Sequence, residues 1–226
     1  MNKMKRILLA IALLAFTPSI FAQTFNFGIK AGINSQKITT DSYQGISGYT
    51  FSDFKADAQN GYNVGLFARI GAKKIYFQPE LLYSNKKATS SFNLTEAPSE
   101  GLSTGAYSQA FDIRAIQIPF LLGYRLIDLK LVSLRAFTGP AMSVILNNTQ
   151  IKLTGPDAIP TSIYDPKMFK NNVWNWQLGG GVDIGPLVLD VRYEWGLTNV
   201  SEGDITKVGF VSKGNTLTFS LGYKFL

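Results

Sequence analysis

The sequence contains no cysteine and no histidine. Without cysteine there are no disulfides, no thiol catalysis and no lipid-bearing terminal cysteine. Without histidine there is no imidazole acid–base chemistry, and the commonest metal ligand is missing. Together these absences disfavour an enzyme, and we expect no cofactor and no metal site.

Long apolar runs are also scarce. The chain is 46% hydrophobic and 13% aromatic, yet beyond the N-terminus no run approaches the roughly 20 residues that a membrane helix needs. Hydrophobicity is spread along the chain. At 226 residues, the chain has room for one domain.

The N-terminus has the three parts of a secretory signal peptide. Lys3, Lys5 and Arg6 precede an apolar stretch over 7–16, and a small residue, Ala22, ends the segment. About ten apolar residues are too few for the alternative, an uncleaved anchor. We expect cleavage after Ala22, which leaves a signal peptide over 1–22 and a single domain over 23–226.

The charge balance beyond Ala22 is mild. This part of the chain carries 19 basic and 15 acidic side chains, a surplus of four positive charges. Nucleic-acid binding proteins concentrate a much stronger basic surplus on one face. We therefore expect no nucleic-acid partner.

From Gln23 onward the sequence alternates between apolar and polar residues. Such a period of two is typical of strands with two different faces. We distinguish eight segments, over 25–34, 62–71, 75–84, 116–124, 132–144, 174–184, 187–198 and 216–225. In the fourth segment the apolar phase shifts upstream, to Phe111 and Ile113, which predicts a β-bulge near Ala115.

The connections between these segments alternate in length. Tight turns are expected near 72–74, 127–128 and 185, and long polar loops over 37–59, 89–107, 147–172 and 199–213. Short turns at one end and long loops at the other are typical of outer-membrane barrels. The sequence predicts an all-β fold, a transmembrane antiparallel up-and-down β-barrel of about eight strands, with both termini in the periplasm.

A soluble β-sandwich would also alternate, but its outer face would be polar. Here the apolar face carries aromatic residues at two levels. The level near the predicted periplasmic end holds Phe25, Phe77, Tyr124, Tyr223 and Phe225, and the level near the outer end holds Tyr62, Tyr83, Trp174, Trp176 and Trp195. Two aromatic girdles around an aliphatic band favour a protein in contact with outer-membrane lipid.

The opposite face carries charges of both signs. An eight-stranded barrel has an interior just wide enough for its side chains, so buried charges there must pair. We predict an interior charge network of Lys30, Glu80, Arg135, Asp190, Arg192 and Glu194. Asp190 and Glu194 could also form an acid–base pair, but structural pairing with Arg192 is the better interpretation.

Two further motifs have competing interpretations. The run Gly179–Gly181 lacks the spacing of a phosphate-binding loop, and we expect these glycines to make room for inward side chains. The 147–172 loop carries Tyr164, Met168 and Phe169. These apolar groups either contact a partner or pack against neighbouring loops.

Several short sequence motifs resemble those of the PorT-like family of outer-membrane β-barrel domains. They are Gly28–Gly32, Gln78–Ser84, Ile118–Pro119, Gly139–Pro140 and Arg192–Thr198. The resemblance extends from Gln23 to the C-terminus. It implies an outer-membrane barrel, and it suggests a secretion-machine accessory because the founding member has that role.

These observations favour a non-enzymatic outer-membrane barrel that contacts a protein or an envelope component through its loops or its periplasmic rim. We expect the barrel-assembly machinery as a partner during biogenesis. The alternative is a narrow channel for ions or small solutes. Bulky inward residues disfavour the channel, namely Phe67, Tyr76, Leu82, Leu121 and Phe137.

Overall fold

The computed structural model describes residues 23–43, 50–96, 103–129, 131–146, 150–156, 172–198 and 210–225. The predicted signal peptide over 1–22 lies outside these ranges, as do Tyr164, Met168 and Phe169. Within the described ranges, every regular element is a β-strand. No helix in this part of the chain is long and apolar enough to cross a membrane.

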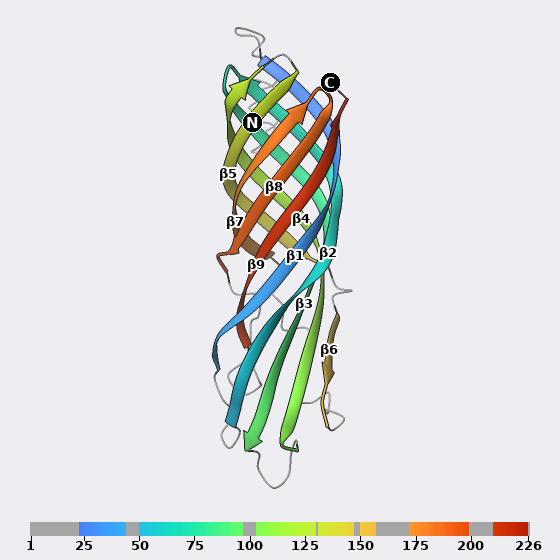
Figure 1. The fold of residues 1–226 in the computed structure, drawn as a ribbon, viewed down its shortest axis with the longest axis vertical. Coiled ribbons are helices and arrows are strands. Elements are labelled where there is room, and N and C mark those ends of the chain that lie inside the picture. The colour runs from blue at the N-terminus through green and yellow to red at the C-terminus, as the bar shows by residue number, and fades with distance from the viewer. Residues whose placement is uncertain are drawn as a thin grey trace, which may run out of the picture.

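Eight long strands close into one antiparallel barrel (Figure 1). Pairing runs in the order β3-β2-β1-β9-β8-β7-β5-β4, and a β3–β4 pairing closes the ring. The predicted fold class is therefore confirmed. The strands of the wall are β1 (Gln23–Tyr43), β2 (Thr50–Ala72), β3 (Ile75–Glu96), β4 (Gly105–Asp128), β5 (Val132–Ile145), β7 (Asn172–Ile184), β8 (Leu187–Gly196) and β9 (Phe210–Lys224).

A ninth described strand, β6 (Gln150–Thr154), lies outside the ring and pairs with residues 108–112 of β4. The sequence predicted a loop here. Its pairing partner lies beyond the end of β5, which pairs with β4 only from Ala115 onward. β6 therefore continues the sheet where β5 has stopped.

Two of the tight turns lie where the sequence predicts them, near 72–74 and 185, whereas the third follows Asp128, because 127–128 belongs to β4. All three lie at one end of the barrel. Lys73 and Gly185 occupy these turns with φ of 54° and 56°, the left-handed region that glycine adopts without strain. β1 begins at this same end, because Gln23 pairs with Ala72 beside the first turn. We call this the turn end of the barrel, and β9 also finishes there (Figure 1).

The wall is much taller on one side than on the other. β2, β3 and β4 have 23, 22 and 24 residues, whereas β7 and β8 have 13 and 10. The sequence predicted loops over 37–59 and 89–107, but much of both ranges is strand. The long strands continue past the end of β8 as a projecting sheet (Figure 1), which we call the extension.

The predicted bulge near Ala115 is wrong. The β3–β4 register is unbroken around this position, and the β4–β5 register shifts only between Arg125 and Ile127. Phe111 and Ile113 are buried on the inner face, together with Ala88 of β3. The apolar phase changes because the extension has its apolar residues inside, whereas the barrel proper has them outside.

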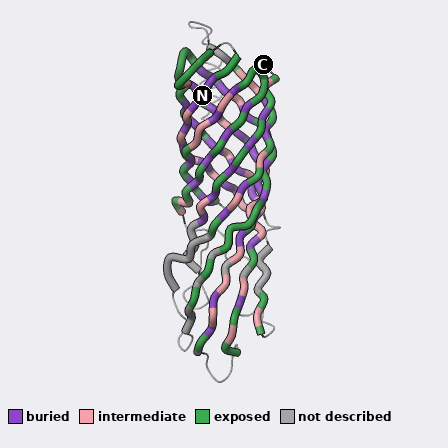
Figure 2. Tube along the Cα trace, in the orientation of Figure 1, coloured by how far each residue is buried: buried purple, intermediate pink, exposed green. Residues whose placement is uncertain are grey.

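Along the barrel proper, buried residues alternate with exposed or half-buried residues on every strand (Figure 2). The exposed residues form an aliphatic band with aromatic residues at both edges. Phe25, Phe77, Tyr124, Tyr223 and Phe225 are exposed toward the turn end, and Tyr62, Trp174, Trp176 and Trp195 are exposed at the other edge. An exposed apolar band between two girdles is the surface that suits a lipid bilayer.

Candidate functional site: the charged interior of the barrel

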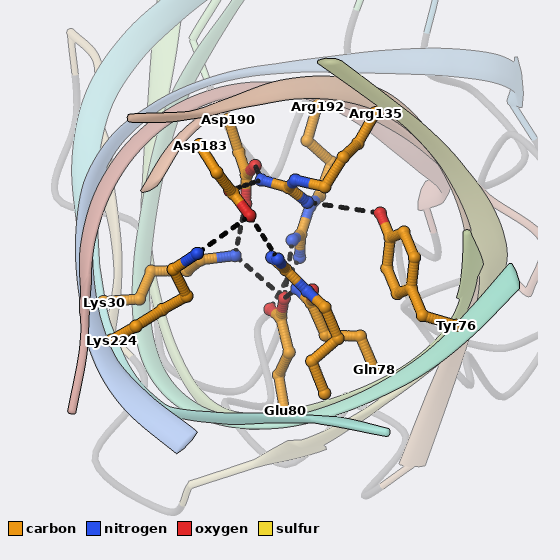
Figure 3. Close-up of polar contacts among 10 residues, drawn as sticks. Lys30, Tyr76, Gln78, Glu80, Arg135, Asp183, Asp190, Arg192 and Lys224 are labelled. Atoms are coloured by element: carbon orange, nitrogen blue, oxygen red, sulfur yellow. Dashed lines mark hydrogen bonds and ion pairs between the residues drawn. The ribbon is translucent and has the colours of Figure 1, made fainter. Parts of the chain in front are cut away.

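The six residues that the sequence predicts as an interior network all point into the barrel. Lys30 lies on β1, Glu80 on β3, Arg135 on β5, and Asp190, Arg192 and Glu194 on β8; none is more than 4% exposed. Period-two alternation places each of them on the face opposite the aliphatic band. Figure 3 shows five of them reaching toward the centre from different parts of the wall.

Lys30 lies at the centre of this network. Its Nζ lies 2.8 Å from Glu80 Oε1 and 2.6 Å from Asp190 Oδ2. All three side chains are at most 1% exposed. A buried ammonium group needs such compensation, because an isolated charge in a dry interior is very costly.

Two arginines extend the network on both sides of Lys30. Arg192 makes a bidentate contact with Glu80, in which Nη1–Oε2 and Nη2–Oε1 are each 2.9 Å. Arg135 Nη2 lies 2.7 Å from Asp190 Oδ1 and 2.8 Å from Asp183 Oδ1. Arg135 also donates to the hydroxyl of Tyr76 at 3.2 Å (Figure 3).

Toward the turn end, the network continues through Asp183. Its Oδ2 lies 2.6 Å from Arg69 Nη1 and 3.2 Å from Lys224 Nζ. Arg69 Nε donates to Gln78 Oε1 at 2.7 Å, and Gln78 Nε2 donates to Glu80 Oε1 at 2.6 Å. One chain of charged and amide groups thus joins the turn end to the centre.

Away from the turn end, Glu194 forms a second centre. It pairs with Lys86 and accepts hydrogen bonds from Gln117 Nε2 and Gln177 Nε2, both at 2.7 Å. Gln177 Oε1 accepts from Arg192 Nη1 at 3.0 Å. Gln177 therefore connects the two halves, and we call the whole assembly the plug.

Apolar side chains fill the space between the charged groups. Phe67, Leu82, Leu121 and Phe137 are at most 2% exposed and lie on the inner face. Phe137 also faces a cation, because Arg192 Cζ lies 5.3 Å from its ring centroid. Such cation–π contacts add to the stability of a desolvated guanidinium.

Glycines provide some of the room that the plug occupies. A Cβ on Gly181 would collide with Asp190 and would lie 2.7 Å from Arg135 Nη2, and one on Gly179 would lie 2.5 Å from the Phe137 ring. These two glycines make room for inward side chains, as predicted. Gly180 does not: it is on the outward face, where a Cβ would meet only Arg135 O at 3.4 Å.

The sequence matches the model of one protein family, described as outer membrane protein beta-barrel domain, over residues 21–202. The match covers most of the chain and most of the barrel wall. The chain belongs to this family.

Three solved structures are similar to this outer-membrane barrel. Ail, the attachment invasion locus protein of Yersinia pestis, solved with the heparin analogue sucrose octasulfate, is 12% identical, with 89% of this chain and 99% of Ail covered at a TM-score of 0.41. OprG from Pseudomonas aeruginosa is 13% identical, with 91% and 98% covered at a TM-score of 0.44. Neisserial surface protein A is 12% identical, with 88% and 97% covered at 0.42. No curated protein matches the sequence.

Family membership explains the exposed apolar band, because an outer-membrane barrel is surrounded by lipid. Exposed aliphatic residues such as Leu178, Leu189 and Leu221 face the acyl chains. Trp176 lies at the girdle away from the turn end, and its Nε1 donates to Thr138 Oγ1 at 2.9 Å. The apolar ring thus meets lipid while its N–H stays hydrogen-bonded.

The plug of this outer-membrane barrel has the features of a structural network. Each of its carboxylates is paired with at least one cation, so none is poised as a free general base. Within the described residues, no three His, Cys, Asp or Glu side chains are grouped to hold a metal ion. Sequence reasoning missed Lys86, which continues the inward phase of β3 two residues past the predicted segment, and also the bridging amides Gln78, Gln117 and Gln177.

Proposed function

We propose that this outer-membrane barrel is non-enzymatic and contacts a protein or an envelope component through its extracellular loops or its periplasmic rim. The finer proposal is a PorT-like accessory of a protein-secretion machine. The observation that carries the proposal is the plug. It fills the interior with paired charges while the outer wall faces lipid, so only the loops, the extension and the rims are left for a partner.

The extension supports this proposal, because it offers a surface beyond the membrane. The outward residues described there include Asp57, Lys87, Ala106 and Ala110, which are polar or small and are exposed. Because β7 and β8 end early, the extension stands on one side of the barrel (Figure 1). We propose that a partner contacts this outward face of the extension.

The orientation that we propose follows from export and from strand number. Cleavage after Ala22 and an even number of wall strands would place both termini and the turn end in the periplasm. The extension would then lie outside the cell. Mass spectrometry of the membrane-extracted protein should show Gln23 at the N-terminus, and a mass that includes residues 1–22 would contradict this orientation.

Co-purification in mild detergent tests the proposed contact. We propose that Tyr164, Met168 and Phe169 contribute to it, so deletion of residues 157–169 should weaken recovery of the partner. This deletion keeps Gly155 and Pro156, which lie close to Tyr107 and Gly105 of the extension. Deletion of residues 201–207, from the segment between β8 and β9, is the control.

The deletion is informative only if the barrel is intact, which a heat-dependent shift on a detergent gel reports. A shifted barrel that recovers less partner than the control deletion supports the loop contact. Full recovery of the same partners would show that the contact does not involve residues 157–169. Absence of any specific partner with wild type would contradict the proposed function itself.

The alternative function, a narrow channel, is less well supported. A conducting lumen needs small inward side chains or water along its length. The plug instead places Lys30, Arg135 and Arg192 across the interior with their charges paired. Near Lys86 and Glu194, a cavity of only about 40 Å³ is present.

A further inference from the structure

The part of the plug that extends from its centre to the turn end holds more positive than negative charge. Five cationic side chains are joined there by ion pairs to three carboxylates. The cations are Lys30, Arg69, Arg135, Arg192 and Lys224, and the carboxylates are Glu80, Asp183 and Asp190. Buried charge requires compensation, and in this cluster two positive charges are left over.

The three carboxylates are already shared among several cations. Asp183 contacts Arg69, Arg135 and Lys224. Glu80 and Asp190 each contact two cations, one of which is Lys30 in both cases. Each carboxylate of the cluster is therefore shared by at least two cations, although Asp183 Oδ1 accepts no hydrogen bond within the described residues. Compensation of the two surplus positive charges would have to come from outside the cluster.

A cavity of about 440 Å³ opens beside this cluster at the turn end. Asp183 and Lys224 of the plug line it, together with Asn26, Arg125, Asp128, Leu129, Leu131, Val132, Ser133 and Gly185. Its volume exceeds that of a phosphate or acetate ion several-fold. We call it the vestibule.

The vestibule contains hydrogen-bond donors that are not fully used. Ser133 is only 8% exposed, and within the described part of the chain its Oγ has no hydrogen-bond partner. Leaving a buried hydroxyl unpaired is costly. Lys224 Nζ contacts Asp183 at 3.2 Å, but an ammonium group has three protons to donate.

The acidic residues of the vestibule do not prevent it from binding a negative group. Asp183 is neutralised by the three cations that it contacts. Asp128 lies 3.5 Å from Arg125 Nη1, and its side chain is 44% exposed, so its charge is screened by solvent. The part of the vestibule lined by Ser133 and Lys224 is therefore the part suited to a negative group.

We propose that the vestibule binds a small oxyanion, a phosphate or a carboxylate group, between Lys224 Nζ and Ser133 Oγ. The bound anion compensates one or both surplus charges of the plug and pairs the buried hydroxyl. The same group can be a free ion or the phosphate of a lipid headgroup. The exposed side chains of Leu129 and Leu131 beside the opening would contact the apolar part of such a lipid.

The test uses the full mature protein in nonionic detergent, titrated with inorganic phosphate and separately with acetate. Ionic strength is held constant with sodium fluoride, and isothermal titration calorimetry and the thermal unfolding midpoint are recorded. We expect saturable binding of at least one oxyanion with a rise in the midpoint. Lys224→Met and Ser133→Ala should each weaken binding about tenfold or more, whereas Lys73→Met, at the same end but outside the vestibule, should not.

Ser133→Ala removes a single oxygen, so it keeps the test usable if Lys224→Met does not fold. No saturable binding of either ion by the wild type, or equal binding by Ser133→Ala and wild type, would overturn the proposal. Vesicles with anionic phospholipid separate the two sources. If free phosphate displaces these vesicles, the site takes a lipid headgroup. If the protein binds free phosphate but the vesicles do not compete for the site, it takes a free ion. Because no partner protein is present, the outcome is independent of the co-purification experiment.

Discussion

Arg192 and Glu80 join opposite sides of the barrel through two parallel hydrogen bonds of 2.9 Å each. Arg192 lies on β8 and Glu80 on β3, which are four strands apart in either direction around the eight-stranded ring. The planar guanidinium matches the two carboxylate oxygens, a geometry that lysine cannot reproduce. This ion pair therefore links the two halves of the barrel wall across the interior.

Removal of the Glu80 carboxylate should destabilise the barrel strongly. Glu80→Ala leaves Arg192 and Lys30 with less compensation, and breaking a buried pair in this way costs about 3–5 kcal/mol. Urea unfolding in lipid vesicles measures the change. Lys87→Ala, on the exposed face of the same strand, should change the unfolding free energy by less than about 0.5 kcal/mol. Equal stability of Glu80→Ala and wild type would show that the pair is not needed.

Two adjacent glycines should respond in opposite ways to alanine. Gly181→Ala places a Cβ against Asp190, Arg135 and Leu189 O, so we expect a loss of about 1–3 kcal/mol from overpacking. Gly180→Ala meets only Arg135 O at 3.4 Å and should be neutral or stabilising by up to about 1 kcal/mol. The same unfolding assay compares them. The inward phase of Gly181 would be wrong if both variants behaved alike.

A charge on the lipid-facing wall should be costly only within the aliphatic band. Leu189 is exposed midway between the girdles, and Leu189→Arg should cost about 2–4 kcal/mol. Ala106 is exposed on the extension, and Ala106→Arg should be tolerated because water surrounds it. Folding yield into vesicles, read from the heat-dependent gel shift, measures both. Similar losses in the two variants would mean that the band does not end below the extension.

The wild-type barrel should carry no steady ionic current. Glu80, Arg192 and Lys30 are paired across the interior, and opening a path would require breaking those contacts. Recordings in planar lipid bilayers at neutral pH test this directly. Discrete and long-lived openings by the purified protein would favour the channel and count against the plug as a permanent closure.

The sequence predicted the barrel well because lipid imposes one rule on every strand. Wherever the wall crosses the bilayer, outward apolar residues such as Leu189 and Phe219 alternate with inward residues that are mostly polar. The rule fails beyond the bilayer, where Phe111 and Ile113 turn inward and water takes the outer face. In β4 this inverted alternation led to the prediction of a loop and then a bulge near Ala115, although the strand is continuous there.

The interior could be predicted as a set of residues but not as a set of pairs. Alternation alone places Glu80 and Arg192 on the inner face. Which cation each carboxylate contacts depends on the stagger between strands, and no local pattern encodes that. The amide bridge of Gln177, between Arg192 and Glu194, is invisible to a search for opposite charges for the same reason.

Gly181 of β7 pairs with Arg135 of β5 on one side and with Asp190 of β8 on the other. This register bears on how the protein assembles. If β7 slipped by one residue during insertion, its own inward and outward faces would exchange. Asp183 would then point away from the cations that it pairs with, and Trp176 would be forced into the crowded interior. The charged interior therefore disfavours incorrect strand registers, because a shift of one residue would break ion pairs throughout the plug.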